Sequence, residues 1–198
     1  MKTLKFVLIF GLCILSLSSC KKGEDLGGDD FSPEKVSFSK FGMQAYFPEN
    51  RWEYRTDENV VMGCEKDYKT DRVRAYLKES GKTVNNQIAY FVYISFERFT
   101  SSFESEDEAN KVIKDIKDSY DLFPNDLSVD SITPSKIGDY PASKMKSKKT
   151  NNGFTSIEES YFVYHEKRFY WIAVIMPENS EHSSECEEII NTLKITDN

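Results

Sequence analysis

Two stretches of the chain are apolar without interruption, Ile88–Ile94 and Phe169–Met176, and Pro177 ends the second. A strand with one solvated face alternates between apolar and polar residues, whereas a strand buried on both faces is apolar throughout. We therefore predict that these two stretches are central strands of a β-sheet that is covered on each side.

Shorter β-prone stretches predict the rest of the sheet. They are Val36–Phe47, where apolar residues alternate, Val60–Cys64, Val73–Leu77, Lys144–Lys148, whose lysines face solvent, and Ile157–Tyr164. Between the last of these and the second apolar stretch, His165–Arg168 has the composition of a hairpin tip. Upstream, Asn152 and Gly153 form the pair that type I′ turns favour.

Two segments have apolar residues at helical spacing. The first begins at a capping box, with Ser105 at the N-cap and Glu108 at N3, and we expect it to end near Asp121. The second begins near Asn179 or Ser180, and its apolar stripe is Cys186, Ile189, Ile190 and Leu193. The order strands, helix, strands, helix predicts an α+β fold, in which helices flank both faces of a central antiparallel sheet.

The N-terminus has the pattern of an export signal. Lys2 and Lys5 precede the apolar run Phe6–Leu15, which is shorter than the roughly 20 residues that span a bilayer. The four residues after it, Leu17, Ser18, Ser19 and Cys20, resemble the bacterial lipobox. In lipobox proteins the peptidase cuts before the cysteine, whose sulfur and new amine then carry acyl chains such as palmitate. The resemblance implies lipid attachment at Cys20, with an ordinary signal peptide as the alternative.

These features divide the chain into three parts. Residues 1–19 are the predicted lipoprotein signal peptide, residues 20–31 the lipidated cysteine and a flexible tether, and residues 32–198 one globular domain. The charged stretch after Cys20 resembles the signal that sends some Gram-negative lipoproteins to the outer membrane. A plain solvated linker explains it equally well, and the sequence leaves open whether the domain is periplasmic or surface-facing.

Composition narrows the classes of function. The chain has 198 residues, 39% of them hydrophobic, and a formal net charge of −7, which argues against nucleic acid as a partner. The two histidines lack metal-ligand spacing, and the chain contains no Gly-x-Ser-x-Gly, Walker or Cys-x-x-Cys motif. We therefore expect no metal and no cofactor, and we expect a protein that is not an enzyme, with an envelope hydrolase as the least favoured class.

Several motifs resemble the PsbP/Mog-like family. The segment Phe47–Trp52 resembles the family's aromatic-Pro-x-x-x-Trp entry, and Ile137–Ala142 resembles its turn with the pattern apolar-Gly-x-x-Pro-Ala. The hairpin Ile157–Met176 and the final segment Asn191–Ile195 also fit. The resemblance implies an α/β/α sandwich. Family members include photosystem assembly factors, a Ran-binding protein and bacterial envelope lipoproteins, which bind partners and are not generally enzymes.

Few residues are candidates for a site. Cys64 and Cys186 are a candidate disulfide in an exported protein, with two buried free thiols as the alternative. Ser131, within Asp130-Ser131-Ile132, resembles an O-glycosylation acceptor of some exported bacterial proteins. Trp52 and Tyr54 follow a proline turn, so we expect them to be partly exposed and available for recognition.

The sequence thus favours a non-catalytic envelope lipoprotein. We expect lipid on Cys20 to hold it at the membrane, and its domain to bind a protein partner or support an envelope complex. The alternative is a lipoprotein that binds a glycan or a small molecule in an aromatic groove.

Overall fold

The computed structural model describes residues 34–38, 41–48, 50–63, 67–84, 87–121, 127–151 and 154–196. The predicted signal peptide, Cys20 and the tether lie outside these ranges. The elements, in chain order, are β1 (Glu34–Phe38), β2 (Met43–Phe47), β3 (Trp52–Gly63), β4 (Asp67–Leu77), the 3-10 helix η2 (Lys78–Ser80), β5 (Gly81–Val84), β6 (Gln87–Tyr90), β7 (Tyr93–Phe99), α2 (Glu106–Asp121), β8 (Leu127–Val129), β9 (Thr133–Ile137), β10 (Tyr140–Asn151), β11 (Phe154–His165), β12 (Arg168–Pro177), α3 (Ser183–Asn191) and β13 (Lys194–Ile195).

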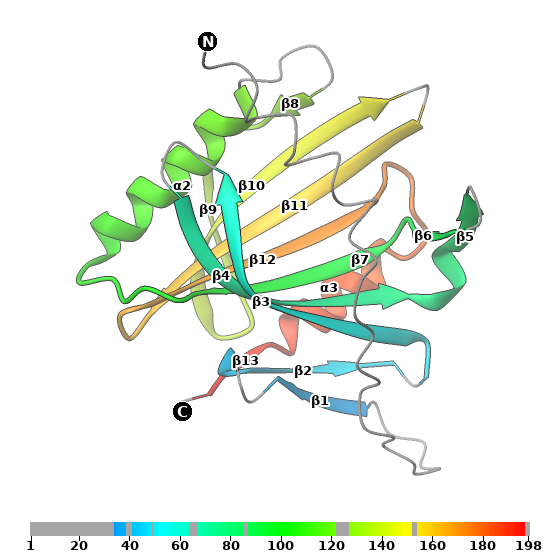
Figure 1. Ribbon diagram of the computed structural model, residues 1–198, viewed down its shortest axis with the longest axis horizontal. Coiled ribbons are helices and arrows are strands. Elements are labelled where there is room, and N and C mark those ends of the chain that lie inside the picture. The colour runs from blue at the N-terminus through cyan, green and yellow to red at the C-terminus, as the bar shows by residue number, and fades with distance from the viewer. Residues whose placement is uncertain are drawn as a thin grey trace.

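The largest sheet has the strand order β3-β4-β7-β12-β11-β10-β8, and β9 pairs with β10 (Figure 1). A second sheet has the order β1-β2-β13, and β5 and β6 form a third. Every strand pair in the described part of the chain is antiparallel. The prediction of a mostly antiparallel sheet with two helices is confirmed, and β12 occupies the central position that its apolar sequence predicts.

Strand β12 contributes side chains to two separate hydrophobic clusters. Tyr170, Ile172 and Val174 belong to the first cluster, with the α3 residues Cys186, Ile189 and Ile190 and with the small sheet β1-β2-β13. Phe169 belongs to the second cluster, with the α2 residues Ala109, Val112, Ile113, Ile116 and Tyr120. Because successive residues of a strand point to opposite faces, this alternation explains why β12 is apolar throughout.

Helix α2 begins as its capping box predicts. The Glu108 backbone N–H donates to Ser105 Oγ at 3.3 Å, and the Glu108 carboxylate accepts from the Glu104 backbone N–H at 2.9 Å. The helix ends at Asp121, as expected. Among the described residues, no helix is long and apolar enough to cross a membrane.

The apolar stretch Ile88–Ile94 is not one strand, so that prediction is wrong in part. β6 ends at Tyr90, the chain bends at Phe91 and Val92, and β7 begins at Tyr93. Val92 accepts a hydrogen bond from the Leu77 backbone N–H at 3.1 Å and is buried in the first cluster. Only Tyr93 and Ile94 of the stretch therefore lie in a strand of the large sheet.

Two other predicted boundaries are also corrected. The stretch Val36–Phe47 forms two strands, β1 and β2, because Gly42 between them has a φ of 65° and turns the chain. Helix α3 begins at Ser183 rather than near Ser180, because Ser180 forms turns instead: its N–H donates to Pro177, and its carbonyl accepts from the Ser183 N–H.

Candidate functional site

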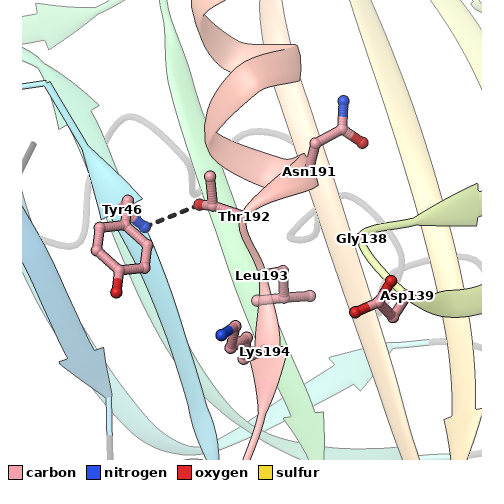
Figure 2. Close-up of a pocket in the computed structure, with 7 residues that line it drawn as sticks. All are labelled: Tyr46, Gly138, Asp139, Asn191, Thr192, Leu193 and Lys194. Carbon is pink, nitrogen blue, oxygen red and sulfur yellow. Dashed lines mark hydrogen bonds between the residues drawn. The ribbon is translucent and has the colours of Figure 1, made fainter.

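A groove of about 440 Å³ lies at the C-terminal end of α3. Figure 2 shows Tyr46 of β2 and Asp139 of the β9–β10 turn on opposite sides of the segment that follows the helix. The Tyr46 backbone N–H donates to Thr192 Oγ1 at 2.8 Å. Lys194 also lines the groove and is exposed, as is Asp139.

The groove is built by the turn that the PsbP-like motif predicts. Gly138 has a φ of 54°, and a Cβ atom there would lie 2.8 Å from the Leu193 carbonyl oxygen. Two residues further on, the Tyr140 hydroxyl accepts from the Ile195 backbone N–H at 2.9 Å and lies 3.3 Å from the Ile195 carbonyl oxygen. The motif residues therefore position the C-terminal segment, and their role in this structure is structural.

A second candidate lies on the α2 side of the large sheet, and we call it the tyrosine–arginine surface. It consists of Arg55, Arg74, Tyr76, Tyr90 and Tyr93, all partly exposed. The Tyr76 ring lies 5.0 Å from the Tyr90 ring and 5.5 Å from the Tyr93 ring, between centroids. The Arg55 guanidinium lies over two of these rings, at 5.0 Å from the Tyr76 centroid and 5.6 Å from that of Tyr90.

Burial and, after it, a hydrogen bond with Glu53 raise the pKa of Tyr90 to about 12. Its phenol is therefore neutral at physiological pH and keeps its proton for donation. Arg55 Nη2 also pairs with a Glu53 oxygen at 3.0 Å. These contacts hold the tyrosine rings and the guanidinium as one preorganised surface.

An aromatic pair extends this surface. The Phe91 and Phe154 rings lie 5.4 Å apart, and the Lys82 ammonium lies 5.5 Å from the Phe91 centroid. Phe154 is 44% exposed, which makes it one of the few large apolar side chains open to solvent in the described residues. Single exposed apolar residues are common, but an exposed aromatic cluster with cations has the composition of an interface core.

Between this surface and α2, the sheet carries a buried polar network around Glu97. The Glu97 carboxylate accepts from Arg72 Nε at 2.7 Å and Nη2 at 3.2 Å, from Thr70 Oγ1 at 3.0 Å and from Ser95 Oγ at 3.2 Å. Only 4% of Glu97 is exposed. A buried carboxylate is costly unless hydrogen-bond donors surround it, and Arg72, Thr70 and Ser95 supply those donors to Glu97. We therefore assign Glu97 a structural role.

A second carboxyl group on this side of the sheet is that of Glu158, on β11. Its carboxyl group accepts from Tyr120 of α2 at 2.9 Å and from Ser160 at 2.7 Å, and Trp171 donates to Ser160 at 2.8 Å. Part of Glu158 is exposed, but its carboxyl group is desolvated. Burial raises the pKa of Glu158 above its ordinary value, the two hydrogen bonds lower it in part, and Glu97 raises it.

A third polar cluster joins α3 to the start of β3. Glu185 accepts from Arg51 at 2.8 Å and from Trp52 Nε1 at 2.9 Å, and Arg51 also pairs with Glu79. His182 lies 3.7 Å from a Glu79 oxygen. In the described residues, no group of three or more His, Cys, Asp or Glu side chains is arranged to hold a metal ion.

The structure places the sequence-predicted residues apart from these clusters or outside the described ranges. Trp52 is 3% exposed and packs in the first cluster, so the expectation that it is exposed is wrong; Tyr54 is partly exposed and packs against the same cluster. Ser131 is exposed, which leaves its modification a prediction. Leu17, Ser18, Ser19 and Cys20 lie outside the described residues.

The candidate disulfide also stays a prediction. Cys186 is buried with a free thiol, and Cys64 lies outside the described residues. Met62, which precedes Cys64 closely in the chain, packs in the second cluster, whereas Cys186 packs in the first.

Sequence reasoning missed the tyrosine–arginine surface. The apolar stretch Ile88–Ile94 predicts a strand buried on both faces, and this prediction places Tyr90 and Tyr93 inside the sheet. The signal that could have found them is the hydroxyl group, since tyrosine tolerates a partly exposed position that isoleucine or phenylalanine disfavours.

No protein-family model matches this chain, and no curated protein matches it. Solved structures do match. The solution structure of cyanobacterial PsbP (CyanoP) from Synechocystis sp. PCC 6803 has 13% identity and a TM-score of 0.53, over 90% of this chain and 98% of that one. A crystal structure from Bacteroides thetaiotaomicron VPI-5482 has 14% identity and a TM-score of 0.51, over 79% of this chain and 46% of that one. This chain therefore spans less than half the length of the Bacteroides protein.

At these identities the likeness concerns the fold alone. This chain has a PsbP-like fold, as the sequence motifs imply. The likeness carries no residue role and no partner from either protein to this chain.

Proposed function

We propose that this protein is a non-catalytic envelope lipoprotein, held by lipid on Cys20, whose PsbP-like domain binds a protein partner. The observation that carries the binding role is the tyrosine–arginine surface, with the exposed Phe154 beside it. Tyrosine, phenylalanine and arginine are the residues that dominate the cores of protein interfaces. The lipid anchor rests on the lipobox-like sequence alone.

The finer description of the fold belongs to this proposal. We infer an α/β/α sandwich in which α2 covers one face of the large sheet, and α3, with the small sheet β1-β2-β13, covers the other. The membership of α2 and α3 in different hydrophobic clusters supports this arrangement. α2 leaves the tyrosine–arginine surface uncovered on its own side of the sheet, which is the position that a partner would occupy.

A protein partner is favoured over a small molecule in a groove. The groove at the end of α3 is lined by other residues. A second groove, of about 600 Å³, lies along α2 between Tyr68, Phe103 and Lys111, and no residue of the tyrosine–arginine surface lines it either. Sugar rings also stack on tyrosine, so a glycan stays the second candidate, and the absence of any recurrent captured protein in the test below would favour it.

The test is a crosslinked pull-down from intact cells with tagged full-length protein. Cys20→Ala serves as the anchor control, and its palmitate labelling is measured in parallel. We expect wild type to incorporate palmitate and to capture one recurrent envelope protein, and Cys20→Ala to lose both. A Tyr76→Ala variant that keeps its lipid should lose the captured protein alone. Labelling that persists in Cys20→Ala would refute the anchor, and capture that persists in Tyr76→Ala would refute the surface.

A further inference from the structure

The groove at the C-terminal end of α3 is bordered by one acidic and one basic side chain. Figure 2 shows Asp139 on the Gly138 side of the segment that follows the helix, and the Lys194 side chain on the Tyr46 side. Both Asp139 and Lys194 are exposed. Within the described part of the chain, neither side chain forms an ion pair or a hydrogen bond, with the other or with a third residue. The groove therefore holds two opposite charges that do not pair.

The Lys194 end of the groove belongs to the outer face of the small sheet β1-β2-β13. Because Ala45 is buried, Gln44 and Tyr46 on either side of it point away from the core. Lys194 is the register partner of Gln44, and Lys35 is the register partner of Tyr46. The described residues that share this face are Lys35, Ser37, Gln44, Tyr46 and Lys194. None of these five has a carboxylate, so this end of the groove is cationic.

The Asp139 end lies against the C-terminal end of α3. A Cβ atom on Gly138, the residue before Asp139, would lie 3.3 Å from the Asn191 carbonyl oxygen and 2.8 Å from that of Leu193. The last carbonyl groups of a helix carry a partial negative charge, which favours a nearby cation. Asp139 adds a full negative charge beside these carbonyl groups. This end of the groove is therefore anionic, and it suits an ammonium group.

We propose that this groove binds a small zwitterion, whose ammonium group lies at Asp139 and whose carboxylate or phosphate group lies at Lys194. The groove volume of about 440 Å³ is within the range of small-molecule sites, roughly 300–1,000 Å³. A ligand with one charge of each sign forms charge-assisted hydrogen bonds at both ends. A free amino acid and the phosphoethanolamine headgroup of a lipid share this chemistry.

This inference goes beyond the proposed function and does not rest on it. The groove shares no residue with the tyrosine–arginine surface. Loss or retention of the captured envelope protein in Tyr76→Ala therefore leaves the zwitterion site undecided on its own terms, and the zwitterion test likewise does not decide the partner.

The test compares zwitterions with their singly charged halves. Glycine is compared with acetate and methylamine, and O-phosphoethanolamine with inorganic phosphate and ethanolamine. Each probe is titrated into the isotope-labelled full-length chain, and the amide chemical shifts give both the affinity and the place of binding. We expect shifts at residues 138–139 and 191–194, and an affinity of a zwitterion at least about threefold higher than that of either of its halves, because each exposed ion pair contributes modestly. The zwitterion that binds more tightly identifies the source as a free amino acid or a lipid headgroup.

Two substitutions of exposed residues separate the ends of the groove. Asp139→Asn should remove the advantage of the zwitterion over its anionic half, and Lys194→Gln should remove its advantage over the cationic half. Both variants should keep the melting temperature of wild type, because neither side chain is buried. The matched controls are Asp130→Asn and Lys136→Gln, which make the same changes of charge at exposed residues that do not line the groove. They should keep the affinity of wild type.

Three results would overturn the proposal. The first is equal affinity for the zwitterions and their halves, and the second is chemical-shift changes confined to other parts of the chain. The third is an affinity for the zwitterions that Asp139→Asn and Lys194→Gln leave unchanged. Tighter binding of inorganic phosphate than of O-phosphoethanolamine, without binding of glycine, would also overturn it, in favour of a simple anion site.

Discussion

Gly138 shows how one missing side chain positions the end of the chain. Its φ of 54° lies in the left-handed region, and a Cβ atom there would lie only 2.8 Å from the Leu193 carbonyl oxygen. The following turn then brings the Tyr140 hydroxyl to the Ile195 backbone. The sequence motif marks this position, but only the structure shows that the neighbour is the segment after α3.

Gly138→Ala should therefore destabilise the domain by about 1–3 kcal/mol, because alanine adds both a strained φ and a close contact with backbone. Urea unfolding at neutral pH measures the change in the free energy of unfolding. Gly81→Ala is the control, since Gly81 has a φ of −71° that any residue adopts. Equal stability of Gly138→Ala and Gly81→Ala would contradict this account of the turn.

At the scale of elements, strand β11 places two adjacent glutamates in opposite environments. Glu158 faces α2, where burial raises its pKa and where Tyr120 and Ser160 donate to it. Glu159 faces the other side, where burial would raise its pKa, but Lys144 at 2.9 Å and Lys146 at 3.3 Å together lower it. The alternation of residues along the strand predicts which side chains share a face of the sheet. It does not predict which of the two faces is exposed to solvent.

Because the pKa values of Glu158 and Glu159 shift in opposite directions, the two residues should make the stability of the fold depend on pH in opposite ways. A raised pKa in the folded state means that Glu158 stabilises the fold below its unfolded pKa, and that this contribution is lost as the pH rises through the folded pKa. Glu158→Gln removes that loss, so the stability of the variant relative to wild type should increase with pH from about pH 4, near the ordinary glutamate pKa of about 4.3, to about pH 8.

Glu159→Gln is the matched control with the opposite sign. A lowered pKa stabilises the fold above the unfolded pKa, and this contribution is lost as the pH falls through the folded pKa. The variant should be less stable than wild type at neutral pH, and the difference should shrink on acidification. Thermal unfolding across the pH range measures both variants, and parallel curves for the two would contradict the assignment of their environments.

The stretch Ile88–Ile94 is the part of the sheet that the sequence did not predict correctly. Val92 enters the first cluster at a bend in Ile88–Ile94, while Ile94 enters the same cluster from strand β7. Periodicity cannot distinguish such a bend from a continuous buried strand. The β11–β12 tip, by contrast, follows from local residues, and Glu166 and Lys167 there have φ values of 47° and 62°.

At the scale of the whole molecule, the described residues form two hydrophobic clusters, and Cys186 is buried in the first of them. Burial raises the pKa of the Cys186 thiol to about 12. We expect this thiol to resist a maleimide reagent in the folded chain and to react once the chain is denatured without reductant. In the mature protein that we propose, which lacks Cys13 and carries lipid on Cys20, Cys64→Ala leaves Cys186 as the one thiol for the rate measurement. Absence of any reactive thiol in denatured wild type would show that Cys64 and Cys186 are paired, against the free thiol of the structure.

The sequence alone determined the features that depend on neighbours in the chain. The α2 cap at Ser105, the hairpin tip at His165–Arg168 and the apolar pattern of β12 follow from local geometry and periodicity. The tertiary structure decided what depends on distant segments. It brought Arg55 opposite Arg74 and set Tyr76 between Tyr90 and Tyr93, because strand pairing joins residues that no local pattern relates. It also buried Trp52 against α3, which the proline turn before it does not reveal.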